Sequence, residues 1–85
     1  MMVVFEVFLA PGADPETLLT EETKRSTKAQ VMTVEDARNA GFAGLPDYGD
    51  KAVRLIAVGK SDAAWIHRAL ETSSAVARFS VNDVD

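Results

Sequence analysis

The residues that could do chemistry in this sequence are few and scattered. Gly59-Lys60-Ser61 follows an apolar run and precedes a helix-like pattern, as the end of a phosphate-binding loop does. That motif also needs a glycine five positions before its Gly-Lys pair, and this chain has Arg54 there. An ordinary strand-to-helix turn explains the three residues, so the sequence does not indicate nucleotide binding.

His67 is the only histidine of the chain, and it lies between Trp65 and Arg68 in a helix-like segment. General acid–base catalysis needs a partner within hydrogen-bond reach, and the neighbouring sequence offers none. A zinc site needs three or four nitrogen, oxygen or sulfur ligands, and the chain has no cysteine. We therefore expect a half-solvated histidine at a helix border, no catalytic residue, no metal site and no cofactor.

Two further polar clusters have simpler explanations than a site. The spacing of Asp14, Glu16, Glu21 and Glu22 does not match the alternating ligands of an EF-hand loop, and an acidic helix start accounts for them. The segment 47–51 (DYGDK) is typical of a polar turn, although its tyrosine could touch a ligand. If the protein binds a small molecule, Tyr48 and His67 are the candidate ligand-binding residues.

A strand–helix–strand unit between residues 52 and 82 organises the chain. Residues 53–58 (VRLIAV) form a strand-length run ended by Gly59, with Ser61 and Asp62 as possible helix caps. From Ala63 the apolar residues recur at helical spacing, with Trp65 at the border of the apolar side. Residues 75–82 (AVARFSVN) alternate as a second strand.

The remaining elements are read from the same patterns. Residues 2–9 (MVVFEVFL) are apolar on both faces, which is typical of an interior strand, and residues 29–34 predict another strand. Asp14 before Pro15 predicts a helix over residues 15–24, with a solvated loop as the alternative. A capping-box spacing from Thr33 to Asp36 predicts a short helix over residues 35–40, with Gly41 at its end.

This element order predicts one α+β domain over residues 1–85. It fits a ferredoxin-like βαββαβ plait with an extra short helix and loop between the second and third strands. In that plait the first strand lies between the third and fourth strands and is antiparallel to both. Alternation along the first strand then points Val3, Phe5, Val7 and Leu9 toward the helices, and Glu6 toward the open face. We expect Phe5, Leu55, Ile66, Leu70 and Phe79 to form the core.

The same alternation predicts a surface for a partner on the open face of the sheet. Arg54 and Arg78 would flank Glu6 there and offset the cost of a carboxylate among apolar residues. An apolar face of this kind is unusual on a monomer, so either the loop 42–48 or a second subunit should cover it. The predicted partner-binding residues are Val4, Glu6, Phe8, Arg54, Ile56, Val76 and Arg78.

Composition narrows the class of protein. The 47% hydrophobic and 26% charged content is that of an ordinary globular protein, and a net charge of −4 disfavours a nucleic-acid partner. Residues 1–10 are too short to span a bilayer and lack the basic leader of a signal peptide. We expect a cytoplasmic protein that binds neither nucleic acid nor membrane.

Two functions fit these observations. The first is a non-catalytic module that self-associates as a homodimer or binds a protein partner. The second is a small dimeric α+β-barrel enzyme or ligand-binding domain, with a pocket between the sheet and the 42–50 loop. A pocket with convergent polar atoms would favour the second, and a flat self-complementary face would favour the first.

The start of the chain also resembles a known family. Its first strand, followed by Leu9-Ala10-Pro11-Gly12 and then Asp14-Pro15, is similar to the start of the small structural subunit of formylglycinamide ribonucleotide amidotransferase. The resemblance covers these opening residues, and residues 35–50 depart from the family's pattern. It implies a small ferredoxin-like protein and assigns no functional residue.

Overall fold

The sheet of this protein has four strands, and its first strand is central. The computed structural model describes residues 1–42 and 52–84. Strands β1 (Met2–Leu9), β2 (Gln30–Met32), β3 (Val53–Gly59) and β4 (Val76–Val84) are arranged in the order β2-β3-β1-β4. β1 is antiparallel to both β3 and β4. This topology confirms the predicted ferredoxin-like fold.

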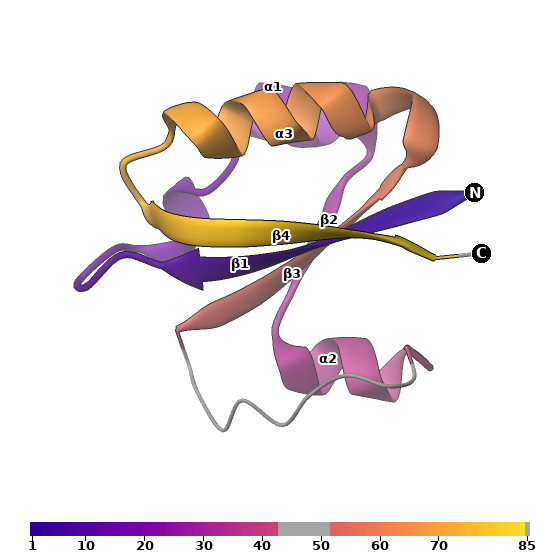
Figure 1. The fold of residues 1–85 in the computed structure, drawn as a ribbon, viewed down its shortest axis with the longest axis horizontal. Coiled ribbons are helices and arrows are strands. Elements are labelled where there is room, and N and C mark those ends of the chain that lie inside the picture. Colours follow the sequence, from indigo (N-terminus) through magenta and orange to yellow (C-terminus); the bar gives the residue numbers. More distant parts are fainter. Residues whose placement is uncertain (43–51, 85) are drawn as a thin grey trace.

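Helices lie on both faces of the sheet (Figure 1). α1 (Glu21–Thr27) and α3 (Ala63–Thr72) cover one face, and the short helix α2 (Val34–Asn39), which follows β2, lies on the other. Two 3₁₀ turns, Pro15–Thr17 and Lys60–Asp62, precede α1 and α3. α2 is the extra helix expected between the second and third strands.

The main core lies between the sheet and the α1–α3 layer. Phe5, Ile66 and Leu70 are each at most 1% exposed, and Phe79 packs at the border, as predicted. Leu55 is also buried, but on the opposite face of the sheet. The buried residues of the main core are Val3, Phe5, Val7, Leu18, Leu19, Ala29, Ile56, Val58, Ile66, Leu70 and Ala75.

A second, smaller core lies beneath α2. Ala37 of α2 is fully buried against Val4, Leu55 and Ala57 of the sheet, and Met32 and Phe42 pack at its border. This contact explains why β3 is apolar on both faces. The sheet face that was expected to be open therefore already carries a helix.

The register of the sheet corrects three of the predicted orientations. Phe5 lies opposite Ile56, and Val7 lies opposite Arg54, so Ile56 and Arg54 share the α1–α3 face instead of the Glu6 face. The register between β1 and β4 shifts at Phe8 and Leu9 of β1, where β4 has one extra residue. This bulge turns Val76 toward the main core, whereas Arg78, opposite Phe8, stays on the predicted face.

The ends of α2 are those that the sequence predicts. The Thr33 hydroxyl accepts a hydrogen bond of 3.0 Å from the backbone N–H of Asp36. At the other end Gly41 has a φ of +96°, and Phe42 N–H donates to the Ala37 carbonyl at 3.1 Å. This is a Schellman closure, in which the residue at Gly41 must be left-handed.

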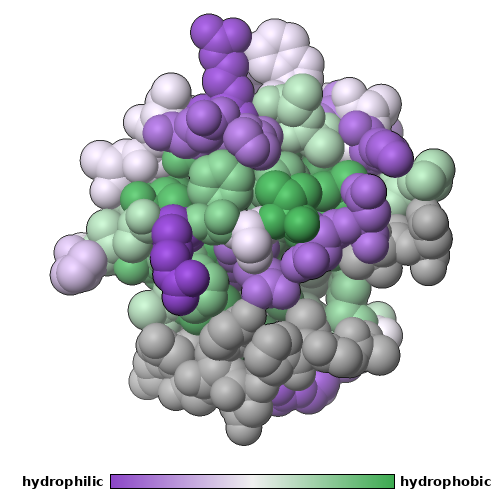
Figure 2. All heavy atoms as spheres, viewed as in Figure 1, coloured by the Kyte–Doolittle hydropathy of each residue, from purple (hydrophilic) through white to green (hydrophobic). Residues whose placement is uncertain are grey.

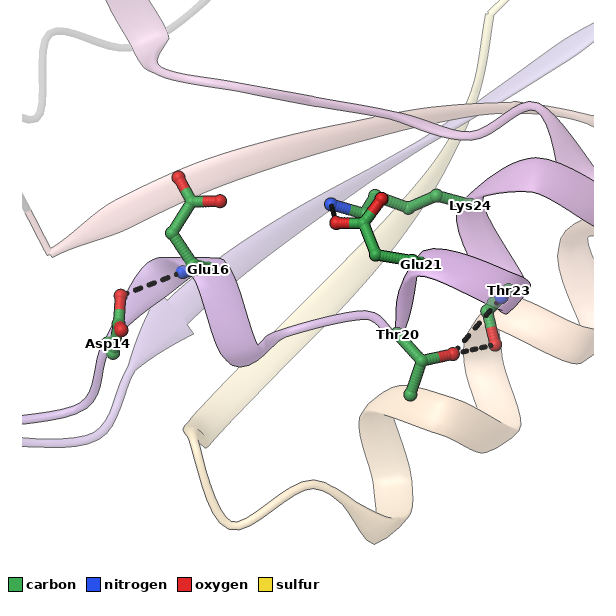
Figure 3. Close-up of polar contacts among 6 residues, drawn as sticks. All are labelled: Asp14, Glu16, Thr20, Glu21, Thr23 and Lys24. Atoms are coloured by element: carbon green, nitrogen blue, oxygen red, sulfur yellow. Dashed lines mark hydrogen bonds and ion pairs between the residues drawn. The ribbon is translucent and has the colours of Figure 1, made fainter.

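The helix predicted over residues 15–24 is divided into two. Asp14 caps the first turn, because its carboxylate accepts the Glu16 N–H at 3.0 Å, but that turn is 3₁₀ and ends at Thr17 (Figure 3). Leu18 and Leu19 then enter the main core. α1 begins after Thr20, whose hydroxyl accepts the Thr23 N–H at 3.1 Å.

Candidate functional site

Most of the residues predicted to bind a partner do not form one surface. Val4 and Ile56 are 4% and 0% exposed, on opposite faces of the sheet, so neither can meet a partner in the folded state. Arg54 and Val76 lie on the α1–α3 face, away from Glu6. Residues Glu6, Phe8 and Arg78 remain on the predicted face.

Those three residues form a polar and aromatic cluster with Asn82. The Arg78 guanidinium carbon lies 4.0 Å from the centre of the Phe8 ring, in a cation–π contact. Asn82 Nδ2 donates a hydrogen bond of 3.1 Å to Glu6 Oε1. The Glu6 carboxylate is therefore held by an amide of β4, and Arg54 lies on the other face.

His67 occupies the helix border that its sequence position predicts. Its Nδ1 lies 2.7 Å from Glu71 Oε1, one helical turn away, and both side chains are about half exposed. The expectation that the neighbouring sequence offers His67 no hydrogen-bond partner was therefore wrong, because residues four apart on a helix lie side by side. The ring packs edge-on against Phe79 at 5.1 Å and Phe5 at 6.4 Å between centroids. Tyr48, the other candidate ligand-binding residue, lies outside the described residues. The contacts of His67 are those of a packed helix side chain.

One hollow beside β2 has a mixed charged lining. Its volume is about 410 Å³, and Lys24 and Arg54 face Asp14, Glu16 and Asp36 across it. Three of these groups are engaged in local contacts. Lys24 pairs with Glu21 at 2.9 Å, Arg54 donates to the Val53 carbonyl at 2.9 Å, and Asp14 caps the 3₁₀ turn (Figure 3).

The hydrogen bond to Glu21 raises the pKa of Lys24, with the charges of Glu21 and Glu16 adding to it. Lys24 is thus fixed as a cation by α1 itself. Since both signs of charge line this hollow and both of its cations have local partners, it does not suit a ligand of one charge.

The strongest candidate site is a groove between α1 and α3, which we call the Trp65 groove. Trp65 is the only tryptophan of the chain, and 66% of its surface is exposed beside a hollow of about 480 Å³. Large aromatic side chains are seldom left this exposed without a role, because they bury well in interfaces. The groove is lined by Thr23, Ser26, Thr27, Asp62, Trp65, Arg68, Ala69 and Thr72.

Three of the four hydroxyl groups that line the Trp65 groove donate to carbonyls of their own helices. Ser26 and Thr27 donate to the Thr23 carbonyl at 3.3 and 2.7 Å. Thr72 donates to the Arg68 carbonyl at 3.1 Å. These hydroxyls therefore do not converge on the hollow as donors for a polar small molecule. The groove offers small side chains and one exposed indole, which suits an apolar side chain of a partner.

Sequence reasoning placed Trp65 only at the border of the apolar side of the helix. That position was a weak signal of exposure, because a residue at the margin of an amphipathic helix's apolar side is not enclosed by the core. What the sequence could not show is the packing of α1 beside α3, which creates the groove.

Other kinds of site find little support in the part of the chain that the structure describes. Residues 1–42 and 52–84 contain no group of three or more metal-ligating side chains. Within the same residues, no helix is long and apolar enough to cross a membrane.

Comparison with known proteins supports the fold and goes no further. No protein-family model and no curated protein matches the chain, so the similarity of its start to the amidotransferase subunit stays a hypothesis. Among solved structures, the chain is similar to the P2 domain of the chemotaxis kinase CheA from Thermotoga maritima, solved in complex with the response regulator CheY. The TM-score is 0.53 at 18% identity, over 98% of this chain and 96% of that one. The two chains therefore share a fold along nearly their whole lengths.

Proposed function

We propose that this protein is a non-catalytic module that binds another protein through the Trp65 groove. The observation that carries the proposal is the 66% exposure of Trp65 beside a hollow in which three of the four lining hydroxyls donate to their own helices. Tryptophan is enriched among the residues that dominate interface energies, particularly where it meets a pocket. The indole would act as the anchor, and an apolar side chain of the partner would fill the hollow beside it.

The energetic gain from covering Trp65 is that of one dominant residue in a protein interface. An aromatic side chain buries about 150–250 Å², at about 25 cal/mol per Å². Covering the exposed two thirds of the indole is then worth roughly 2–4 kcal/mol. Asp62 and Arg68 at the margins of the groove can orient the partner by opposite charges.

The structural comparison supports this proposal at the level of the fold. The similar domain is held in a complex with another protein, so a ferredoxin-like chain of this size can present a protein-binding surface. The alternative, an enzyme or small-molecule site, needs a pocket with convergent polar atoms. The polar groups that line the hollows beside β2 and between α1 and α3 are largely bonded to their own elements instead. Self-association is favoured by a different surface, the edge of β4.

Site-specific photo-crosslinking in the source cells tests the proposal. A photoreactive residue at position 65 is compared with one at Glu35 of α2, which is exposed on the opposite side of the sheet. We expect one adduct of defined mass from position 65 and none of that mass from position 35. Excess wild-type protein should compete the adduct away, and excess Trp65→Ala protein should not.

The partner identified in this way is then titrated against the purified protein. Trp65 is the only tryptophan, so its fluorescence should shift to shorter wavelength as the partner covers it. Equal adducts from both positions, or equal competition by Trp65→Ala, would exclude the Trp65 groove as the binding surface.

A further inference from the structure

The outer edge of β4 is a second surface that the proposed function does not use. In the described part of the chain β4 pairs only with β1, and it is nine residues long, whereas β2 at the opposite edge has three. Figure 1 looks onto this edge, with β4 running across the front of the sheet. Half of the backbone N–H and C=O groups of an edge strand point away from its neighbour and can pair with another strand.

This edge lacks the usual protection against pairing. β4 contains no proline, and its bulge lies at its beginning, before Arg78. From Arg78 to Asp83 the pairing with β1 is regular, and the four residues 79–82 (FSVN) carry no charge. A long, regular edge with an uncharged centre can serve as a template for another strand.

Apolar surface is exposed along the same edge. Val81 is 43% exposed and adjoins a shallow hollow of about 550 Å³, and Phe79 is half buried. Figure 2, which has the same view, shows green surface across the middle of this face beneath purple groups. The hollow is lined by Phe5, Ala63, Ala64, His67, Arg68, Glu71 and Val81.

We propose that β4 pairs with β4 of a second copy of this chain, antiparallel and centred on Ser80, to give a continuous eight-stranded sheet. Ser80 is the middle residue of Val76–Val84, so this register overlaps the two strands along their whole length. It places Phe79 opposite Val81 of the second copy, and Arg78 opposite Asn82. A two-fold axis through the two Ser80 residues makes the contact closed and symmetric.

The side chains on both faces are complementary in this register. On the α1–α3 face the two Phe79–Val81 pairs cover the exposed valines with aromatic rings, a favourable cross-strand pairing. On the other face each Arg78 approaches the Asn82 of the second copy, which holds Glu6 by a hydrogen bond of 3.1 Å. The register keeps the two Arg78 residues apart, whereas a register centred on residue 78 would place them face to face.

The occupant that fits this edge best is a second copy. A foreign peptide would have to place an apolar, a neutral and a second apolar residue in succession, with polar residues on both sides of them. β4 itself supplies this pattern in the reversed direction, because its sequence is balanced about Ser80. The residues of α3 that adjoin the hollow carry both signs, Arg68 and Glu71, so two copies of this helix need not repel each other.

Cysteine crosslinking tests both the dimer and its register, because the chain contains no cysteine of its own. Opposite residues of antiparallel strands have Cα atoms about 4.5–5.5 Å apart, within the range of a disulfide. Ser80→Cys should therefore form a covalent dimer rapidly under mild oxidation. Arg78→Cys and Asn82→Cys lie on the same face, but each would be roughly 13 Å from its own copy. Neither should crosslink alone, and their mixture should crosslink readily.

Sedimentation of the unmodified protein and of two lysine variants completes the test. Wild type should sediment as a dimer at micromolar concentration. Val81→Lys should weaken the dimer about tenfold or more, since it removes two cross-strand pairs. Trp65→Lys makes the same kind of change at an exposed residue away from β4, and it should leave the dimer intact.

A wild type that sediments as a monomer would overturn the proposal. A dimer in which Arg78→Cys alone crosslinks as fast as Ser80→Cys would overturn the register. A dimer dissociated by Trp65→Lys and not by Val81→Lys would place self-association in the Trp65 groove and refute pairing through β4. Because Trp65→Lys leaves β4 unchanged, failure of one proposal does not decide the other.

Discussion

Phe5 of β1 lies directly opposite Ile56 of β3, and the two side chains are 1% and 0% exposed. Their pairing sets which face of β3 meets the α1–α3 layer. With Ile56 on that face, Val58 follows it into the main core, and Leu55 and Ala57 are left to the smaller core beneath α2. A single cross-strand pair thus assigns Leu55, Ile56, Ala57 and Val58 to one of two cores.

The position of Ile56 predicts the outcome of Ile56→Asp. A carboxylate there would be buried without a partner in the main core, at a cost of roughly several kcal/mol. Since domains are typically stable by about 5–15 kcal/mol, we expect the variant to be largely unfolded. Circular dichroism in the far ultraviolet measures this directly. Ser80→Asp, an exposed change in β4, should stay folded. A folded Ile56→Asp would mean that β3 is turned the other way.

Leu70→Ala tests the packing of α3 on the sheet. Leu70 is 1% exposed, and truncating a buried leucine costs about 2–5 kcal/mol. Urea denaturation should show a lower midpoint with an unchanged slope. Arg68→Ala, on the exposed side of the same helix, should stay within about 0.5 kcal/mol of wild type. If the two variants were equally stable, α3 would have to be rotated about its axis.

Two glycine substitutions separate backbone strain from side-chain effects. Gly41 has a φ of +96° at the end of α2, so Gly41→Ala should cost about 1–2 kcal/mol. Gly59 has a φ of −64°, and a Cβ there meets no atom within 4 Å. Gly59→Ala should therefore be neutral or slightly stabilising. Thermal unfolding of both variants gives the comparison, and equal losses would argue against the Schellman closure of α2.

Amide hydrogen exchange should distinguish α1 from the centre of the sheet. Thr27 is the only buried residue of α1, whereas five of the seven residues of β3 are buried and the other two are partly buried. Local opening is easiest where few buried contacts are lost, so α1 and the turn before it should exchange soonest among the described elements. Leu18 and Leu19 anchor the start of this segment and should be its slowest amides. Protection of α1 equal to that of β3 would contradict the prediction.

The Glu21–Lys24 pair predicts a small dependence on alkaline pH. The raised pKa of Lys24 means that the folded state holds this proton more tightly than the unfolded state. The contribution is present below the ordinary lysine pKa of 10.5 and is lost as the pH rises through the raised value. NMR titration should show the Lys24 pKa falling in Glu21→Gln and changing less in Glu22→Gln. The same fall in both variants would mean that the hydrogen bond is not the cause.

The strand order could be predicted because the order of strands and helices along the chain matches the ferredoxin-like plait. The faces of β1 could be predicted because Glu6 is its one polar residue. Alternation could not predict which residues of β3 lie on each face of the sheet. The reason is that the strand is apolar at nearly every position: Val53, Leu55, Ile56, Ala57 and Val58. Val76 was misassigned because a bulge between Phe8 and Leu9 shifts the parity of β4, and bulges leave no mark in the pattern. The Trp65 groove could not be predicted either, because it forms where α1 and α3 pack together, and the sequence pattern does not show which helices are neighbours.

The central place of β1 has a consequence for biosynthesis. Both of its neighbours, β3 and β4, come from the second half of the chain. At about 5–20 residues per second, β1 leaves the ribosome seconds before either neighbour exists. During that interval one of the most apolar segments of the protein has no strand to pair with. A nascent chain of this order should therefore engage holding chaperones until Val53–Gly59 has emerged and can pair with β1.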